Sequence, residues 1–181
     1  EYTRPDETRL MDGTEEALYN RILEAIEGAD LTKEELTINI SDLYLYRTNP
    51  EDLDRLKRAF ERAVNDHPQY FYVGNSMSYF YNSTSQKITE VILSIDTSYT
   101  EADRRAFQEK VGELVDAAAG MSDLEAALFF HDYLVTHIYY TPDSERESDG
   151  GFPSVCHNAY GALMNGDAVC QGYALAYKLL L

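Results

Sequence analysis

Apolar residues recur at helical spacing in two segments near the start of the chain. Over residues 14–28 they fall every three or four positions, acidic residues occupy the first turn, and Gly28 can end the helix. Asn49 and Pro50 suit the N-cap and the first position of a second helix, and an apolar stripe follows them. The pattern therefore predicts helices over residues 14–28 and 50–66.

The apolar period changes from helical to alternating in two other segments. Residues 36–40 alternate between apolar and polar, which is typical of a half-buried strand. Aromatic and β-branched residues then dominate residues 70–97, broken by two turn-like stretches, Gly74-Asn75-Ser76 and 82–85. This part predicts an antiparallel meander with three strands, over residues 70–73, 77–81 and 87–95.

From residue 100 onward the pattern is helical again. Two pairs have the spacing of a capping box, Thr100 with Asp103 and Ser122 with Glu125, and each precedes an apolar stripe. The second stripe is expected to contain these residues: Leu124, Leu128, His131, Leu134, Val135 and Ile138. A polar loop then leads to a short helix over 157–164, a turn at 165–167, and a last helix beginning at residue 169 or 170.

Charge excludes two classes of partner. The chain has 15 lysines and arginines against 32 aspartates and glutamates, a net charge of −17, which repels nucleic acid and anionic lipid surfaces. No apolar run is long enough to span a bilayer, so we expect no membrane insertion. The two cysteines are too few for a disulfide scaffold at this length.

The segment from Asn165 to Ala174 carries the candidate chemistry. A tight turn delivers Cys170 to the first turn of a helix, where unpaired backbone N–H groups and the helix dipole favour a thiolate. The same N–H groups can stabilise an oxyanion after the sulfur attacks a carbonyl. Gly172 leaves space beside the sulfur for a substrate, as a cysteine acyl-transfer enzyme requires.

These residues resemble a known family. The run Gly166-Asp167-Ala168-Val169-Cys170-Gln171-Gly172-Tyr173-Ala174, preceded by Tyr160-Gly161-Ala162-Leu163 and His131-Asp132-Tyr133-Leu134, is similar to bacterial transglutaminase-like proteins, whose core resembles papain-type cysteine peptidases. The resemblance covers about residues 100–181. It implies that Cys170 is the nucleophile, and it makes Gln171, Gly172 and Tyr173 weaker candidates for substrate contacts.

The fold expected from pattern and resemblance together is α+β. Residues 1–98 would form a domain of helices on a small antiparallel sheet. Residues 99–181 would form the helical part of a transglutaminase-like, papain-like core whose β-barrel lobe is missing. In the family a histidine and an aspartate follow the cysteine on that lobe, so the parent protein is expected to be longer and this chain alone inactive. The uncovered 170–181 helix would then favour self-association.

The resemblance implies cysteine-dependent acyl transfer or amide and peptide hydrolysis on a protein or peptide substrate, without a metal or organic cofactor. The alternative is a non-catalytic binding or scaffolding module of a cell-surface protein with the same fold. Acidity, the resemblance to bacterial surface proteins and a polar start without methionine favour a secreted or cell-surface location.

Other interpretations of the cysteines, the histidines and the polar loop remain open. Cys156 is expected to be a structural cysteine, and a Cys156–Cys170 disulfide is an alternative that would inactivate the nucleophile. A metal site would need ligands from this set: His131, His137, Cys156, His157 and Cys170; their spacing matches no common pattern. His131 is expected to be a hydrogen-bonded core histidine rather than an upstream catalytic base. Residues 143–151 suit a solvated linker or a flap over the cleft.

Overall fold

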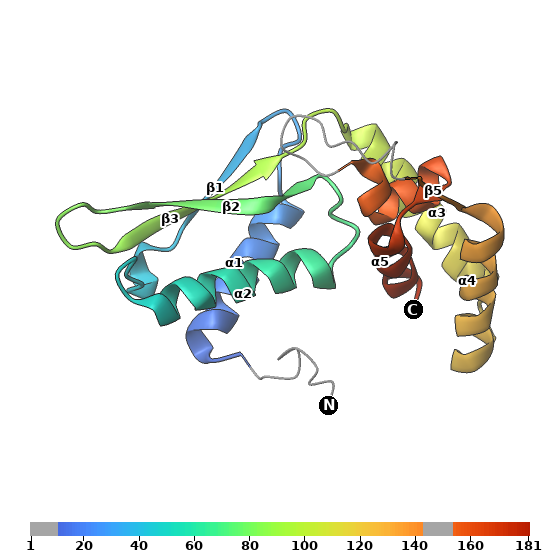
Figure 1. Ribbon diagram of the computed structural model, residues 1–181, viewed down its shortest axis with the longest axis horizontal. Coiled ribbons are helices and arrows are strands. Elements are labelled where there is room, and N and C mark those ends of the chain that lie inside the picture. Colours follow the sequence, from blue (N-terminus) through green and yellow to red (C-terminus); the bar gives the residue numbers. More distant parts are fainter. Residues whose placement is uncertain (1–10, 143–153) are drawn as a thin grey trace.

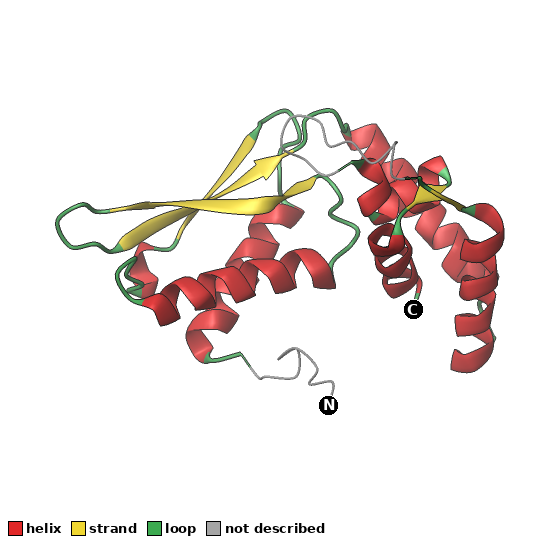
Figure 2. Ribbon diagram, in the orientation of Figure 1, coloured by secondary structure: helices red, strands yellow, loops and turns green. Residues whose placement is uncertain are grey.

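A computed structural model of the protein describes residues 11–142 and 154–181 and shows a mixed α and β fold (Figures 1 and 2). The first half consists, in chain order, of α1 (Gly13–Glu27), β1 (Glu35–Asn39), the 3₁₀ turn η1 (Ser41–Leu43), α2 (Pro50–Asp66), β2 (Val73–Tyr81) and β3 (Ile88–Ile95). The second half consists of α3 (Glu101–Ala117), α4 (Asp123–His137), β4 (Tyr139–Tyr140), η3 (Val155–His157), η4 (Gly161–Asn165), β5 (Asp167–Ala168) and α5 (Cys170–Leu180). The α+β class predicted from the sequence is confirmed at this level.

The first half is a three-stranded antiparallel sheet with two helices on one face (Figure 1). The strand order is β1-β3-β2, so β3 is central and pairs Leu93 with Leu36 of β1 and Met77 of β2. Val91, Leu93 and Ile95 alternate as buried residues along β3, as a sheet covered on one face requires, and Ile88 is buried before the register shift with β2. The apolar faces of α1 and α2 cover this side and form the core of the first half.

The chain between α2 and β3 differs from the predicted meander. Residues 70–72 form a turn, in which Tyr70 N–H donates to His67 O and Val73 N–H donates to Tyr70 O. The predicted Gly74-Asn75-Ser76 turn instead lies inside β2, where the pairing register with β3 shifts between Val73 and Met77. The sheet therefore contains a β2–β3 hairpin and β1. The turn-like residues form a bulge within β2. Glycine suits a bulge because it has no side chain.

The helices begin where their capping residues predict. Asp12 caps α1 and Asn49 caps α2 by accepting backbone N–H groups of the first turn. Both predicted capping boxes are present, because Thr100 and Ser122 each exchange hydrogen bonds with the residue three positions later. The helix boundaries therefore lie within about two residues of the predicted ones.

Two predictions for the second half are wrong in detail. Helix α4 buries Phe130 and Leu134, whereas Leu124 is 71% exposed. His131 lies on the exposed face and bonds to Asp132, so it is not a core histidine. The helix carries apolar residues on most sides, so spacing alone could not identify the buried face. The short helix expected over 157–164 is present over 159–165, ending in the π-helical turn η4, and the 3₁₀ turn η3 precedes it.

An aromatic cluster joins the two halves. Phe71 contacts the rings of Tyr99, Phe107 and Tyr160, with centroids 4.5–5.0 Å apart. Arg104 of α3 also reaches across the junction, where its guanidinium lies over the Tyr72 ring and donates to Ala29 O. Buried residues of both halves therefore form one continuous core. The domain boundary predicted between residues 98 and 99 falls in the connection from β3 to α3 and stays a prediction.

Candidate functional site

A series of short structural elements fixes the backbone position of Cys170. Gly166 adopts a left-handed conformation, φ 75°, which ends η4 and turns the chain into β5. Strand β5 pairs in parallel with β4, and Val169 follows in extended conformation as the N-cap of α5. The N–H of Val169 donates to Cys156 O at 2.9 Å, and its carbonyl accepts Tyr173 N–H at 3.0 Å. Cys170 is the first residue of α5, as predicted.

Two glycines allow this segment to pack closely. A Cβ on Gly172 would lie 2.5 Å from Cys156 O and 3.1 Å from Asn158 O. A Cβ on Gly161 would collide with the backbone carbonyl of Val155. The first turn of α5 and the start of η4 are therefore pressed against η3. Gly172 is buried at this contact, so its missing side chain provides space for protein backbone and not for a substrate, contrary to our expectation.

The thiol of Cys170 is exposed on the first turn of α5. Its N-cap is Val169, whose side chain cannot accept a hydrogen bond, and α5 has no side-chain cap. The first N–H groups of a helix have no partner within the helix, and they carry the positive end of its dipole. The site therefore combines an accessible sulfur with backbone donors that can stabilise negative charge on the sulfur or on an oxygen bonded beside it.

Of the residues that flank Cys170, Tyr173 has a packing role. Its hydroxyl donates to Ile138 O at 2.5 Å, and its ring stacks beside Tyr140 with centroids 6.2 Å apart. Burial, with a smaller effect of Tyr140, raises the pKa of the Tyr173 hydroxyl. These contacts join α5 to the end of α4. Gln171 in contrast is exposed and reaches an open cleft.

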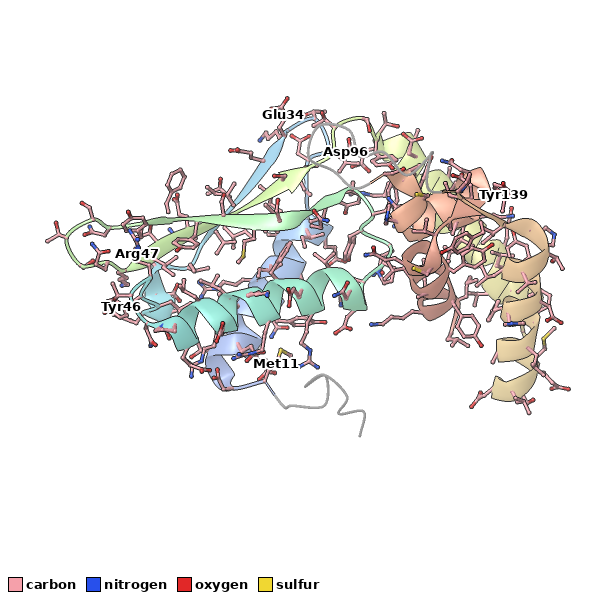
Figure 3. The ribbon with its side chains drawn as sticks, viewed as in Figure 1. Met11, Glu34, Tyr46, Arg47, Asp96 and Tyr139 are labelled. Carbon is pink, nitrogen blue, oxygen red and sulfur yellow. The ribbon has the colours of Figure 1, made fainter. Side chains whose placement is uncertain are left out.

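This cleft lies between the two halves of the molecule and has a volume of about 100 Å³. Its walls come from the end of α2, the turn before β2, the segment after β3, η3 and α5. Asp96, at the junction of the sheet with the helical half, is one of its lining residues (Figure 3). His157 at the end of η3 and Asn158, the residue that follows it, also line the cleft. The sequence suggested His157 only as a candidate metal ligand and did not indicate Asn158. Their proximity to Gln171 depends on the close packing at Gly172, which no local pattern shows.

The four histidines of the chain have hydrogen-bond partners other than Cys170. His67 bonds to the Tyr19 hydroxyl at 2.8 Å. His131 lies beside Asp132, and His137 lies beside the Tyr133 carbonyl at 2.9 Å. His157 contacts Ser154 O at 3.2 Å, and its Nδ1 lies 3.5 Å from the Cys156 sulfur. None of these contacts supplies Cys170 with a base.

Cys156 is buried, and its side chain contacts Ser154 and His157. Its structural role stays a prediction. Both cysteines are free thiols, so the alternative disulfide is not formed in this structure.

Among residues 11–142 and 154–181, no group of three or more histidine, cysteine or acidic side chains is arranged to hold a metal ion. The loop predicted as a linker or flap over 143–151 lies outside the described residues.

Comparison with models of known protein families and with curated proteins finds no match to this chain. The transglutaminase-like resemblance therefore rests on the sequence motifs alone. In the described part of the chain, no helix is both long and apolar enough to cross a membrane.

Proposed function

We propose that Cys170 is the nucleophile of a cysteine-dependent acyl transfer or amide hydrolysis, of the transglutaminase-like or cysteine-protease type. One observation carries the proposal: an exposed thiol occupies the first residue of a helix that has no side-chain cap. Motif and geometry agree here, because the segment that resembles the family is also the segment that delivers Cys170 to this position. The substrate would be a protein or peptide.

The chemistry would proceed in two stages. The Cys170 sulfur attacks a carboxamide or peptide carbonyl, and the N–H groups of the first turn of α5 stabilise the oxyanion. The C–N bond then breaks, the amine leaves with a proton, and a thioester remains on Cys170. An amine or water attacks the thioester and releases the thiol. A general base and acid are needed in both stages, and the resemblance assigns that role to a histidine that would follow Cys170.

A binding module is the second candidate, and it applies if Cys170 has no base. The four histidines of this chain bond to groups other than Cys170. If no other histidine reaches Cys170 in the working protein, the fold would hold a partner without turning it over. The two candidates differ in whether Cys170 forms and releases a thioester.

Acylation by an activated ester tests the proposal. The protein is incubated with p-nitrophenyl acetate, and peptide mapping by mass spectrometry locates the acetyl group. We expect a thioester at Cys170 that an added amine removes, no such adduct in Cys170→Ala, and an unchanged adduct in Cys156→Ser. A Cys170 that stays unmodified while lysines are acetylated would contradict the nucleophile role and leave the binding candidate.

A further inference from the structure

One cleft lies beside the N-terminal end of α5, close to Cys170 in the sequence. Gln171 and Leu175, four residues apart on one face of α5, form one wall. Val64 and Asn65 at the end of α2 belong to the opposite part of the lining, and Phe71 joins them. Cys170 precedes Gln171 directly, on the adjacent exposed face of the helix. The cleft therefore begins one residue along the helix from the candidate nucleophile.

The lining combines an apolar floor with hydrogen-bonding side chains, among them the uncharged amides of Asn65 and Gln171. Val64, Phe71 and Leu175 provide apolar surface. The side-chain amides of Asn65 and Gln171 form no hydrogen bond with any described residue, so they are available to a ligand. This combination suits a peptide, whose side chain can rest on the floor while its backbone pairs with the amides.

The size of the cleft and the charge of its lining bear on which ligand side chain it can bind. The cleft has a volume of about 100 Å³ and is open to solvent, so it can admit a side chain of a bound peptide. The only acidic group in the lining is Asp96, whose carboxylate accepts hydrogen bonds from the N–H and hydroxyl of Ser98. Together with the net charge of −17, this carboxylate disfavours an anionic side chain.

Contacts join the elements that form the walls of the cleft. Lys178 of α5 forms an ion pair with Asp66 of α2 at 2.7 Å. His67, which lines the cleft, is fixed by the Tyr19 hydroxyl. On the other side, the ring of Phe71 packs on Tyr99 and Tyr160. A site whose walls are fixed before binding loses less entropy when a ligand enters.

We propose that this cleft is a specificity subsite that binds a neutral aliphatic side chain next to the acyl group that reacts with Cys170. The inference rests on the proposed function of Cys170 and adds the class of substrate. The apolar floor binds the side chain, and Asn65 and Gln171 hydrogen-bond with the peptide backbone beside it. Peptides with an acidic or a missing side chain at that position bind less tightly.

The test uses three reagents that alkylate thiols: N-chloroacetyl-leucinamide, N-chloroacetyl-glycinamide and N-chloroacetyl-aspartic acid amide. In each reaction a C–S bond forms at Cys170, chloride leaves and the thiol proton passes to solvent. Iodoacetamide, which has no side chain, reports the intrinsic reactivity of the thiol. Alkylation rates at Cys170 are measured by mass spectrometry. We expect the leucine reagent to exceed the glycine reagent about tenfold, as for an aliphatic group in an apolar pocket, and the aspartate reagent to be slowest.

Variants then connect this preference to the cleft. Asn65→Trp places a large ring at the mouth of the cleft and is expected to reduce the leucine-to-glycine ratio to about one, because the side chain can no longer enter. Glu61→Trp, one turn earlier on the exposed face of α2 and outside the lining, is the matched control and keeps the ratio. Leu175→Ala, which removes part of the floor, also lowers it.

The outcomes separate the two proposals. Equal rates with the leucine and glycine reagents, while iodoacetamide reacts readily, would overturn the subsite and leave Cys170 as a nucleophile. A preference for leucine that survives in Asn65→Trp would also overturn it, because the preference would then arise elsewhere. A Cys170 that is inert to iodoacetamide would overturn both the subsite and the proposed function.

Discussion

The carbonyl oxygen of Cys156 occupies the space in which a side chain on Gly172 would begin. A Cβ on Gly172 would lie 2.5 Å from that oxygen, too close for any real contact. The same carbonyl accepts the N–H of Val169, so it fixes the start of α5 from two sides. The placement of Cys170 therefore depends on a glycine two residues later in the helix.

Substituting Gly172 should test this packing. We expect Gly172→Ala to destabilise the fold by about 1–3 kcal/mol, because backbone atoms must move to admit the methyl group. Gly112 is the matched control: it lies inside α3, and a Cβ there meets nothing within 4 Å. Gly112→Ala should stabilise by roughly 0.5–1 kcal/mol through helix propensity. Urea unfolding measures both, and a neutral Gly172→Ala would show that the contact is looser than described.

The capping box at the start of α4 offers a second test. Ser122 accepts Glu125 N–H, and the Glu125 carboxylate accepts both the N–H and the hydroxyl of Ser122. Ser122→Ala should cost about 1 kcal/mol of unfolding free energy, because first-turn donors lose their acceptor. Glu125→Gln retains an acceptor at the third position and should cost less. If both variants unfold at the same urea concentration as the parent, the box contributes nothing measurable.

The ion pair between Arg21 and Asp42 predicts a pH dependence. Two hydrogen bonds of 2.6 Å from the Arg21 guanidinium are the main reason that the pKa of Asp42 falls from 3.8 to about 2. Because the folded-state pKa is depressed, the stabilisation is present above about pH 4 and disappears as the pH falls through about 2.

Thermal unfolding of Asp42→Asn measures this effect. The variant should be less stable than the parent at pH 6, and the difference should shrink as the pH is lowered towards 2. Arg21→Met removes the other partner and should behave in the same way. A difference between parent and variant that does not depend on pH would show that the pair does not shift the titration of Asp42.

Salt should weaken the link between α2 and α5. Lys178 and Asp66 are 48% and 39% exposed, so their ion pair is screened by solvent and should contribute no more than about 1 kcal/mol. Lys178→Met should therefore lower stability slightly at low ionic strength, and the loss should vanish in 1 M salt, where screening acts within about 3 Å. Lys57→Met, which breaks the Lys57–Glu61 contact within α2, controls for a general loss of charge. A loss for Lys178→Met that is unchanged in high salt would instead indicate apolar packing of its side chain.

Local signals predicted much of the first half and the position of Cys170. Capping residues such as Asn49 and Ser122 determine where helices begin, because they satisfy donors within one turn. The turn at Gly166 and the start of α5 at Cys170 are also determined by residues that are close in sequence. These features depend on neighbours in sequence, so the sequence alone could show them.

Features that depend on distant contacts were not predictable in this way. The strand role of Gly74 depends on pairing with β3, and the exposed position of His131 depends on which side of an evenly apolar helix meets α5. Gly172 was expected to make space for a substrate, whereas Cys156 O fills that space. The cleft joins residues from α2, η3 and α5, which are up to about a hundred positions apart, and no pattern along the chain connects them.

The central claim is that the fold presents Cys170 as a nucleophile, and the rate of its acylation is the most direct measurement. The rate constant for acetyl transfer from p-nitrophenyl acetate to Cys170 is compared between the folded protein and the same chain unfolded in urea, with Cys156→Ser to leave one thiol. The account predicts faster transfer to Cys170 in the folded chain, because the first turn of α5 stabilises the developing oxyanion. A rate equal to or below that of the unfolded chain would contradict it, since the fold would then give the cysteine no advantage.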